Sequence, residues 1–262
     1  MADKRRVIYY RDEINDEFSV AQITPRKIDG NYRYDHTSVW KKFTHFFWYR
    51  LVATPIAFLY TKIAFHHKVV HRKRLKQFGK HAYFLYGNHT QDIADAVIPG
   101  LLDPRRRVWV IVHANNVSMP YLGKITPYLG AIPLPDDKMA YRSFIRLIEK
   151  RLAEKKKIAI YPEAHIWPYY TGIRPFTADS FSYPIKYRVP VFCFTNTYQK
   201  RRCSKKPRMV TYIDGPFFPD LTLPREEQKR ELRDRVHATM CERARLSTVE
   251  VIRYVRKEET HG

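Results

Sequence analysis

The residues in this chain best suited to chemistry follow a short apolar run. Tyr83–Tyr86 is predicted to be a strand, and the backbone must turn at the next three residues, Gly87–His89. Asp92 and Asp95 lie within two helical turns of the histidine. A histidine beside a carboxylate can act as a general base whose ring is held by its partner. The spacing therefore predicts an acid–base pair at the carboxyl end of a strand.

The local structure around this histidine allows a second interpretation. Thr90 is predicted to cap a helix over Gln91–Ile98, which Pro99 helps to end. A histidine at a strand end can also simply cap a turn, and Asp92 in a first helical turn can simply complement the helix dipole. From these residues alone, the catalytic and the structural interpretations both remain open.

Other polar groups follow predicted strands in the same way. Val108–Val112 ends at His113, and Ile158–Tyr161 is followed by Glu163 and His165. In a parallel sheet the carboxyl ends of the strands share one edge, which is where open α/β folds bind ligands. We therefore expect these residues to approach the first histidine.

Strands and helices alternate along the rest of the chain. Val189–Phe194 and Val210–Ile213 are predicted strands, and apolar residues at helical spacing predict a helix over Tyr141–Leu152. Pro224 opens a charged helix with an apolar docking stripe formed by Leu232, Val236 and Met240. This order predicts an α/β fold with a mainly parallel sheet flanked by helices.

The composition favours an anionic partner. The 262 residues carry a formal net charge of +22, with 44% hydrophobic and 15% aromatic residues. Phospholipid head groups, a phosphorylated or CoA-linked substrate and nucleic acid all fit that charge. The three cysteines, Cys193, Cys203 and Cys241, lack disulfide-framework spacing, and the N-terminus does not resemble a secretory signal. We therefore expect a reducing cytoplasm.

An aromatic and apolar segment at 43–65 is followed by a basic stretch at 66–80. Pro55 interrupts the apolar segment, which is shorter than the ~20 residues a spanning helix needs. We expect an interfacial helix that, with the basic stretch, attaches the protein peripherally (monotopically) to the anionic cytoplasmic face of a membrane. A buried core helix is the alternative. The predicted units are an extension (1–42), this membrane-associating segment (43–80), a catalytic core (81–220) and a C-terminal helix (221–262).

Six short segments between about Tyr83 and Ile213, half of the chain, resemble motifs of the lysophospholipid acyltransferase family. Each is weak alone, but their order is specific. Gly87–Asp95 is similar to the motif Asn-His-x4-Asp, and Tyr161–Ala164 is similar to Phe-Pro-Glu-Gly. Between them, Met119–Gly123 and Leu129–Leu134 are similar to Pro-x-x-Gly and Gly-x-Ile. Arg174–Phe176 followed by Val189–Val191 is similar to Pro-Phe … Val-Pro-Val.

The chain departs from this pattern at three places. Five residues rather than four separate the histidine and aspartate of the first motif, Asp136 stands where the family has arginine, and Ala164–Ile166 replaces Gly-Thr-Arg. The family arginines are linked to the acceptor phosphate. Arg142 or Arg174 could replace them, or the acceptor could be different.

The resemblance implies a glycerolphosphate acyltransferase-like fold and O-acyl transfer to a lysophospholipid such as 1-acylglycerol-3-phosphate. The donor is an acyl thioester of CoA or of acyl carrier protein, and no metal or cofactor is expected. His89 would take the hydroxyl proton, Asp95 would orient the ring, and backbone N–H groups at the helix start would stabilise the oxyanion. The expected substrate-binding residues are Asn88, Glu163, His165 and Arg174.

Three alternatives remain at this stage. If His89, Asp92, His113, Glu163 and His165 converge, they could hold a metal for hydrolysis, although no short His-x-His or His-Glu-x-x-His pair is present. Charge and aromatic content permit a nucleic-acid-binding protein, but no signature of one occurs, so nucleic acid is not an expected partner. The departures also allow a catalytically inactive relative.

Overall fold

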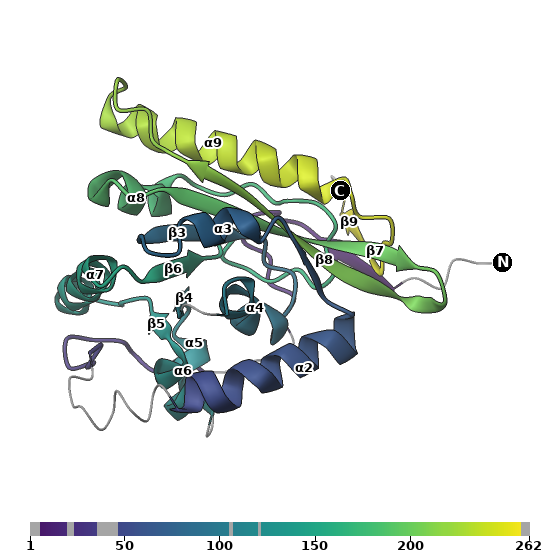
Figure 1. Cartoon of the computed structure of the whole chain (residues 1–262), viewed down its shortest axis with the longest axis horizontal. Coiled ribbons are helices and arrows are strands. Elements are labelled where there is room, and N and C mark those ends of the chain that lie inside the picture. The colour runs from purple at the N-terminus through teal and green to yellow at the C-terminus, as the bar shows by residue number, and fades with distance from the viewer. Residues whose placement is uncertain (1–5, 20–23, 36–46, 105–106, 120–121, 258–262) are drawn as a thin grey trace, which may run out of the picture.

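In this computed structural model, the described residues are 6–19, 24–35, 47–104, 107–119 and 122–257. Within them, seven strands form one sheet in the order β2-β8-β7-β3-β6-β4-β5. All neighbours in the sheet are parallel except β7 and β8, which are antiparallel. This confirms the predicted mainly parallel α/β sheet (Figure 1).

The strands of this sheet are β2 (Lys68–Val70), β3 (Tyr83–Gly87), β4 (Val108–Val112), β5 (Ala131–Pro133), β6 (Lys157–Ile160), β7 (Val191–Arg201) and β8 (Ser204–Phe217). The helices are α2 (Thr54–Phe65), α3 (Lys73–Gln77), α4 (Ala94–Leu102), α5 (Asn115–Ser118), α6 (Leu122–Leu129), α7 (Lys138–Ala153), α8 (Ser182–Tyr187) and α9 (Arg225–Ala244), with a π-helical turn η1 (Phe47–Ala53) and a 3₁₀ turn η2 (Asp179–Phe181).

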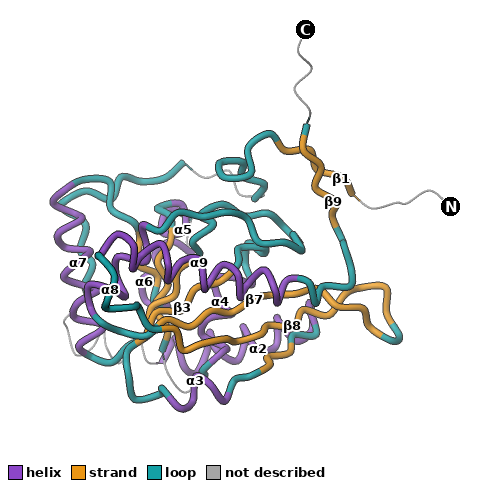
Figure 2. Tube along the Cα trace, turned by 90° about the horizontal axis from the view of Figure 1, so that it is seen from above, coloured by secondary structure: helices purple, strands orange, loops and turns teal. Residues whose placement is uncertain are grey.

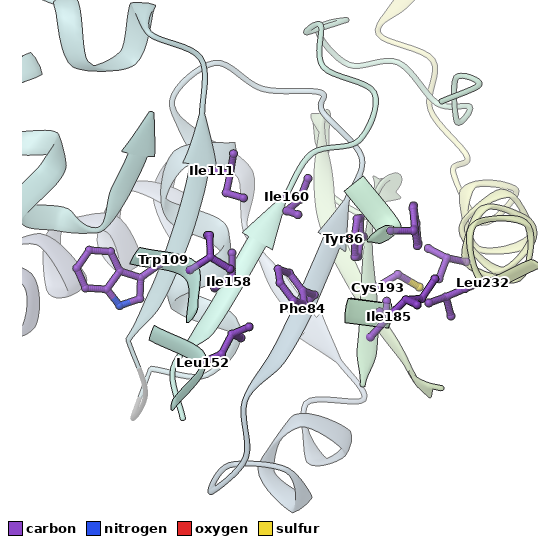
Figure 3. Packing of buried hydrophobic residues seen from close by; sticks show 14 of the residues in the cluster. Phe84, Tyr86, Trp109, Ile111, Leu152, Ile158, Ile160, Ile185, Cys193 and Leu232 are labelled. Carbon is purple, nitrogen blue, oxygen red and sulfur yellow. The ribbon is translucent and has the colours of Figure 1, made fainter. Parts of the chain in front are cut away.

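Alternating side chains of the strands build two cores, one on each face of the sheet. In β3, Phe84 and Tyr86 pack into the core covered by α7, α8 and α9, whereas Tyr83 and Leu85 pack into the core covered by α2, α3 and α4. Figure 3 shows Phe84 and Tyr86 in the first of these cores. Because every residue of β3 is buried, this strand is a rigid support for whatever follows it.

Helix α9 occupies only Arg225–Ala244 of the predicted C-terminal helical unit (221–262), and its apolar stripe is a docking face. Leu232, Val236 and Met240 of α9 are fully buried in the first core. Beyond α9 the chain returns as β9 (Ile252–Arg256), which pairs in parallel with β1 (Arg6–Tyr10) near the N-terminus. Figure 2 shows this two-stranded unit beside the main sheet. Two strands that are about 240 residues apart in the sequence are therefore paired.

Several predicted boundaries were wrong. The helix expected over Gln91–Ile98 begins only at Ala94, and it continues to Leu102 with Pro99 inside it. Proline is tolerated in the first turn of a helix because the N–H groups there have no acceptor within the helix. Pro99 lies in the second turn of α4. The strands predicted to end at Phe194 and Ile213 are parts of the longer hairpin formed by β7 and β8.

The segment at 43–65 matches neither of its two interpretations fully. Residues 43–46 lie outside the described residues, and the remainder forms η1 and α2. Ala57, Thr61 and Phe65 form a buried stripe, so α2 packs on the domain, where it lies along the lower side in Figure 1. Its other face is apolar and exposed. None of the described helices is both long enough and apolar enough to cross a membrane.

Candidate active site

The histidine singled out in the sequence lies directly beyond the end of β3. Gly87, the last residue of that strand, pairs with Phe194 of β7. A Cβ added to Gly87 would lie 2.1 Å from Cζ of Phe194, so only glycine fits between the two strands here. This close approach fixes where the chain leaves the sheet, and with it the position of His89.

His89 is paired with Asp95. The ring Nδ1 lies 2.9 Å from Oδ2 of Asp95, whose side chain is fully buried, whereas Asp92 is exposed in the turn before α4. The same Oδ2 accepts the backbone N–H groups of Thr90 at 2.6 Å and Gln91 at 2.8 Å. The extra residue between histidine and aspartate is thus absorbed in a turn that folds around the carboxylate. The structure has the expected pairing, and its catalytic use stays a prediction.

This geometry sets the tautomer of the ring. An ionised carboxylate only accepts hydrogen bonds, so Nδ1 of His89 must carry the proton and Nε2 must hold the lone pair. Among the described residues only Nδ1 has a hydrogen-bond partner, and the side chain remains 18% exposed. The ring stacks on Tyr161 at 4.5 Å between centroids, and the Tyr161 hydroxyl donates to the backbone carbonyl of Asp95 at 2.5 Å. Burial raises the pKa of Tyr161 well above its ordinary value, which keeps this hydroxyl protonated as a donor.

A buried chain of hydrogen bonds supports the other oxygen of Asp95. Asn196 Nδ2 donates to Oδ1 at 3.3 Å, Thr211 Oγ1 donates to the Asn196 Oδ1 at 2.7 Å, and His67 Nε2 lies 2.8 Å from Thr211 Oγ1. Since the threonine hydroxyl has one proton, which it gives to the amide, His67 Nε2 must be the donor at the outer end. Burial and the charges of Lys62 and Arg72 lower the pKa of His67 to about 4. At neutral pH this series of hydrogen bonds therefore runs from the neutral imidazole of His67 to the carboxylate of Asp95.

Asn88 joins the two central strands. Its Oδ1 accepts the backbone N–H of Asn196 at 2.8 Å, and its Nδ2 donates to the backbone carbonyl of the same residue at 3.0 Å. The side chain is 1% exposed. Although the sequence assigns Asn88 to substrate binding, its polar atoms are here engaged with β7.

Glu163 and Arg174 brace the turn from the side of β6. Glu163 Oε2 accepts the N–H of His89 at 3.0 Å, and its Oε1 accepts the N–H of Arg174 at 3.0 Å. Burial raises the pKa of Glu163, while Arg174 and these N–H groups oppose that rise. The Arg174 guanidinium is fully buried against Trp167 and donates to the carbonyls of Glu163 and His165. Both residues are expected from the sequence to bind substrate, but the structure uses their polar atoms to hold the turn.

The remaining predicted residues do not reach the dyad. His165 Nδ1 lies 3.3 Å from Glu17 Oε2, and His113 is exposed beyond β4 with its Nδ1 near the N–H of Asn115. Within the described ranges no three His, Cys, Asp or Glu side chains are arranged to hold a metal ion. The ligand set of the hydrolase alternative is therefore not brought together.

The structure also places groups from two of the other motif positions. The N–H groups of Thr90 and Gln91 donate to Asp95, and the helix begins only at Ala94, so stabilisation of an oxyanion by N–H groups at the helix start stays a prediction. Asp136, at the position where the family motif has arginine, holds the N-terminal extension through the N–H of Ile28 at 2.6 Å. Arg142, one of the two candidates to replace that arginine, is exposed on α7.

The sequence analysis missed Asn196 and Thr211. The available signal was polarity in a strand, because Thr195, Asn196 and Thr197 follow the apolar run that ends at Phe194. All three are buried. Consecutive buried polar residues in a central strand need partners, so they are candidates for an internal network.

The sequence profile of the Acyltransferase family matches residues 63–195, half of the chain. The chain belongs to the acyltransferase family. This match includes the dyad and the motifs at Tyr161–Ala164 and Val189–Val191, so the family resemblance is confirmed. No match is found among curated proteins.

A solved structure supports the fold of this acyltransferase. This chain resembles the crystal structure of the 1-acyl-sn-glycerophosphate (LPA) acyltransferase PlsC from Thermotoga maritima, with a TM-score of 0.52 and 17% sequence identity. The similarity covers 78% of this chain and 86% of PlsC. At this identity the likeness concerns the fold, and it confirms the expected acyltransferase-type architecture.

The two candidate carboxylates of this acyltransferase make a direct test. Asp95→Asn should lower kcat by up to about 10⁴-fold, because an amide can favour the wrong imidazole tautomer. Asp92→Asn removes the same charge from an exposed position and should leave kcat within about threefold, since it leaves Asp95 in place. Steady-state kinetics of both variants would contradict this assignment if Asp92→Asn were the more damaging.

The buried chain behind Asp95 predicts an effect of Thr211. Thr211→Val removes the hydroxyl that orients the Asn196 amide, and we expect kcat to fall about tenfold with KM unchanged, which corresponds to about 1.4 kcal/mol. Thr211→Ser should restore kcat. Thr195→Val is the matched control, because the buried Thr195 hydroxyl has no hydrogen-bond partner within the described ranges. A change in KM alone, or equal losses in the control, would refute a positioning role.

Proposed function

We propose that this acyltransferase moves a fatty acyl group from an acyl thioester to a hydroxyl of a lysophospholipid. The observation that carries the proposal is the dyad, in which Asp95 fixes the proton on Nδ1 of His89 and leaves the Nε2 lone pair on a partly exposed ring. The family match supplies the reaction class. The name of the PlsC structure suggests 1-acyl-sn-glycerophosphate as the kind of acceptor.

The proposed reaction needs one base and no covalent enzyme intermediate. His89 Nε2 accepts the proton of the acceptor hydroxyl while its oxygen attacks the thioester carbonyl. The buried carboxylate of Asp95 stabilises the imidazolium that forms. When the tetrahedral intermediate collapses, the C–S bond breaks and the leaving thiolate takes the proton from Nε2. The ester and free CoA, or free acyl carrier protein, are then released.

The buried groups around the dyad act as positioning residues in this proposal. Asn88 ties the strand ends together, and the Glu163 carboxylate holds the backbone of His89. Arg174 keeps that carboxylate in place from a fully buried position. We therefore assign acceptor recognition to more exposed groups and not to these three residues.

Helix α2 is the proposed site of contact with the cytoplasmic face of a membrane. Its residues Ile56, Leu59 and Ile63 are each more than half exposed and lie opposite its buried stripe. Lys68 and Lys73, which follow α2, are also exposed. An amphipathic helix with nearby cations binds an anionic bilayer without spanning it. Arg74 contributes less to this attraction, because it is paired with Asp214.

Removing the base tests the catalytic proposal. His89→Ala should lower the rate of acyl transfer by roughly 10²–10⁴-fold, the usual contribution of a general base. The assay uses purified protein with labelled acyl-CoA and acyl-acyl carrier protein donors against a panel of lysophospholipids. His113→Ala, at the end of β4 two strands away from β3, is the control and should remain active. Wild-type turnover by His89→Ala would disprove the mechanism, whereas a failure of every acceptor with the wild type would disprove the substrate class.

Shortening the apolar face of α2 tests membrane attachment. Leu59→Ser with Ile63→Ser should weaken co-sedimentation with anionic vesicles at least tenfold, since each buried side chain contributes about 1.5–3 kcal/mol. Met139→Ser with Leu221→Ser is the control, because these side chains are similarly exposed on other elements. High salt alone should weaken binding only partly, as the apolar contribution is not screened. Equal losses in both variants, or no binding by the wild type, would contradict the proposal.

A further inference from the structure

A cavity of about 280 Å³ lies beside α2 on the side away from the dyad. Its lining joins α2 to β2 and to the end of α4 and consists of Phe58, Lys62, His67, Lys68, Val69, Arg72 and Leu101. Leu101 is six residues beyond Asp95 on α4, about 9 Å along a helix axis. Around the α2 axis, Phe58 and Lys62 lie roughly opposite Tyr60, which contacts Phe65 next to the active-site turn. The cavity thus does not contain the dyad, although His67 in its lining is the outer end of the hydrogen-bond chain behind Asp95.

The polar part of the lining is cationic. Lys62, Lys68 and Arg72 contribute three positive charges, and no aspartate or glutamate from the described part of the chain lines the cavity. Among the described residues none of the three forms an ion pair, although Asp103 attracts Arg72 at longer range. Like charges held together this way repel one another unless an anion lies between them.

Arg72 is the most buried of the three cations. Its guanidinium donates to the carbonyl of Leu101 at 3.0 Å, and burial lowers the pKa of Arg72. An oxyanion in the cavity would offset this loss of hydration. Guanidinium and ammonium groups together favour phosphate oxygens.

The rest of the lining favours an amphiphile over a hydrated ion. Phe58, Val69 and Leu101 give the cavity an apolar wall. Phe58 and Lys62 lie one turn apart on a flank of α2, next to the exposed apolar face that carries Leu59. A lipid whose chains lie along that face would place its head group at the cations. The volume is near the lower end of the ~300–1,000 Å³ of small-molecule sites, which suits a head group without its chains.

We propose that this cavity, lined by Lys62, Lys68 and Arg72, is a binding site for the phosphate of an anionic phospholipid head group, separate from the acyl-transfer site. It goes beyond the proposed function, because the bound lipid is neither donor nor acceptor. The proposed site depends on the proposed membrane contact of α2 only because that contact would supply the lipid. In this site the lipid would hold the acyltransferase at one orientation on the bilayer.

The test measures binding without a membrane and without turnover. Full-length protein is titrated by calorimetry with monomeric dihexanoyl phosphatidylglycerol, which is neither the acceptor nor the product of the proposed reaction. We expect saturable one-site binding that weakens at least tenfold in Lys62→Gln/Lys68→Gln. The control Arg225→Gln/Arg230→Gln removes two exposed charges from α9, across the sheet, and should stay within about twofold of wild type.

Two further measurements, on Lys68→Glu and with inorganic phosphate, distinguish the possible outcomes. Lys68→Glu reverses one exposed charge, so it should fold normally, keep the wild-type Tm and bind at least tenfold more weakly. Inorganic phosphate should bind at least tenfold more weakly than the short-chain lipid, and equal affinity would overturn the lipid source in favour of free phosphate. Equal losses in the cavity and α9 variants, or no saturable binding by the wild type, would overturn the site. Acyl transfer is not the readout, so this result and the failure of the proposed function are distinguishable.

Discussion

The buried carboxylate of Asp95 is the interaction on which the catalytic turn depends. Oδ2 accepts the His89 ring and two backbone N–H groups, and Oδ1 accepts the amide of Asn196. A buried charge is tolerated only when it is bonded in this way. The hydrogen bonds that stabilise this buried charge also fold the turn between β3 and α4. The geometry of the His89–Asp95 pair and the local fold therefore have one cause.

The sheet supplies what a turn cannot, which is a fixed distance between residues far apart in the chain. Asn196 is opposite Thr211 in the antiparallel pair of β7 and β8. Strand β2 pairs with the other side of β8, and this pairing brings His67, just before β2, close to Thr211. Asn88 attaches the end of β3 to Asn196. A hydrogen-bond chain of this length stays ordered because each member is held by a strand or is fully buried.

Helix α2 separates two surfaces with different roles in these proposals. On one flank Tyr60 packs on Phe65, which contacts Tyr169, and Tyr169 donates its N–H to the carbonyl of Thr90 in the active-site turn. Phe58 and Lys62 line the cationic cavity on the other flank. Between them lies an apolar face, so contact with a bilayer would bring the site of acyl transfer and the cavity to the same surface. Amphiphilic substrates collect there, which raises their local concentration.

The sequence by itself determined the family and the approximate place of the candidate site. Local propensity and strand-end position identified His89, the mainly parallel sheet and the family, because these depend on short stretches of residues. Only the tertiary structure decided that Asp95 rather than Asp92 meets the ring, that Arg174 is buried, and that Asn196 completes the carboxylate shell. Those outcomes depend on strand register and on where α4 begins, which are set by contacts between residues more than a hundred positions apart. No local pattern contains that information.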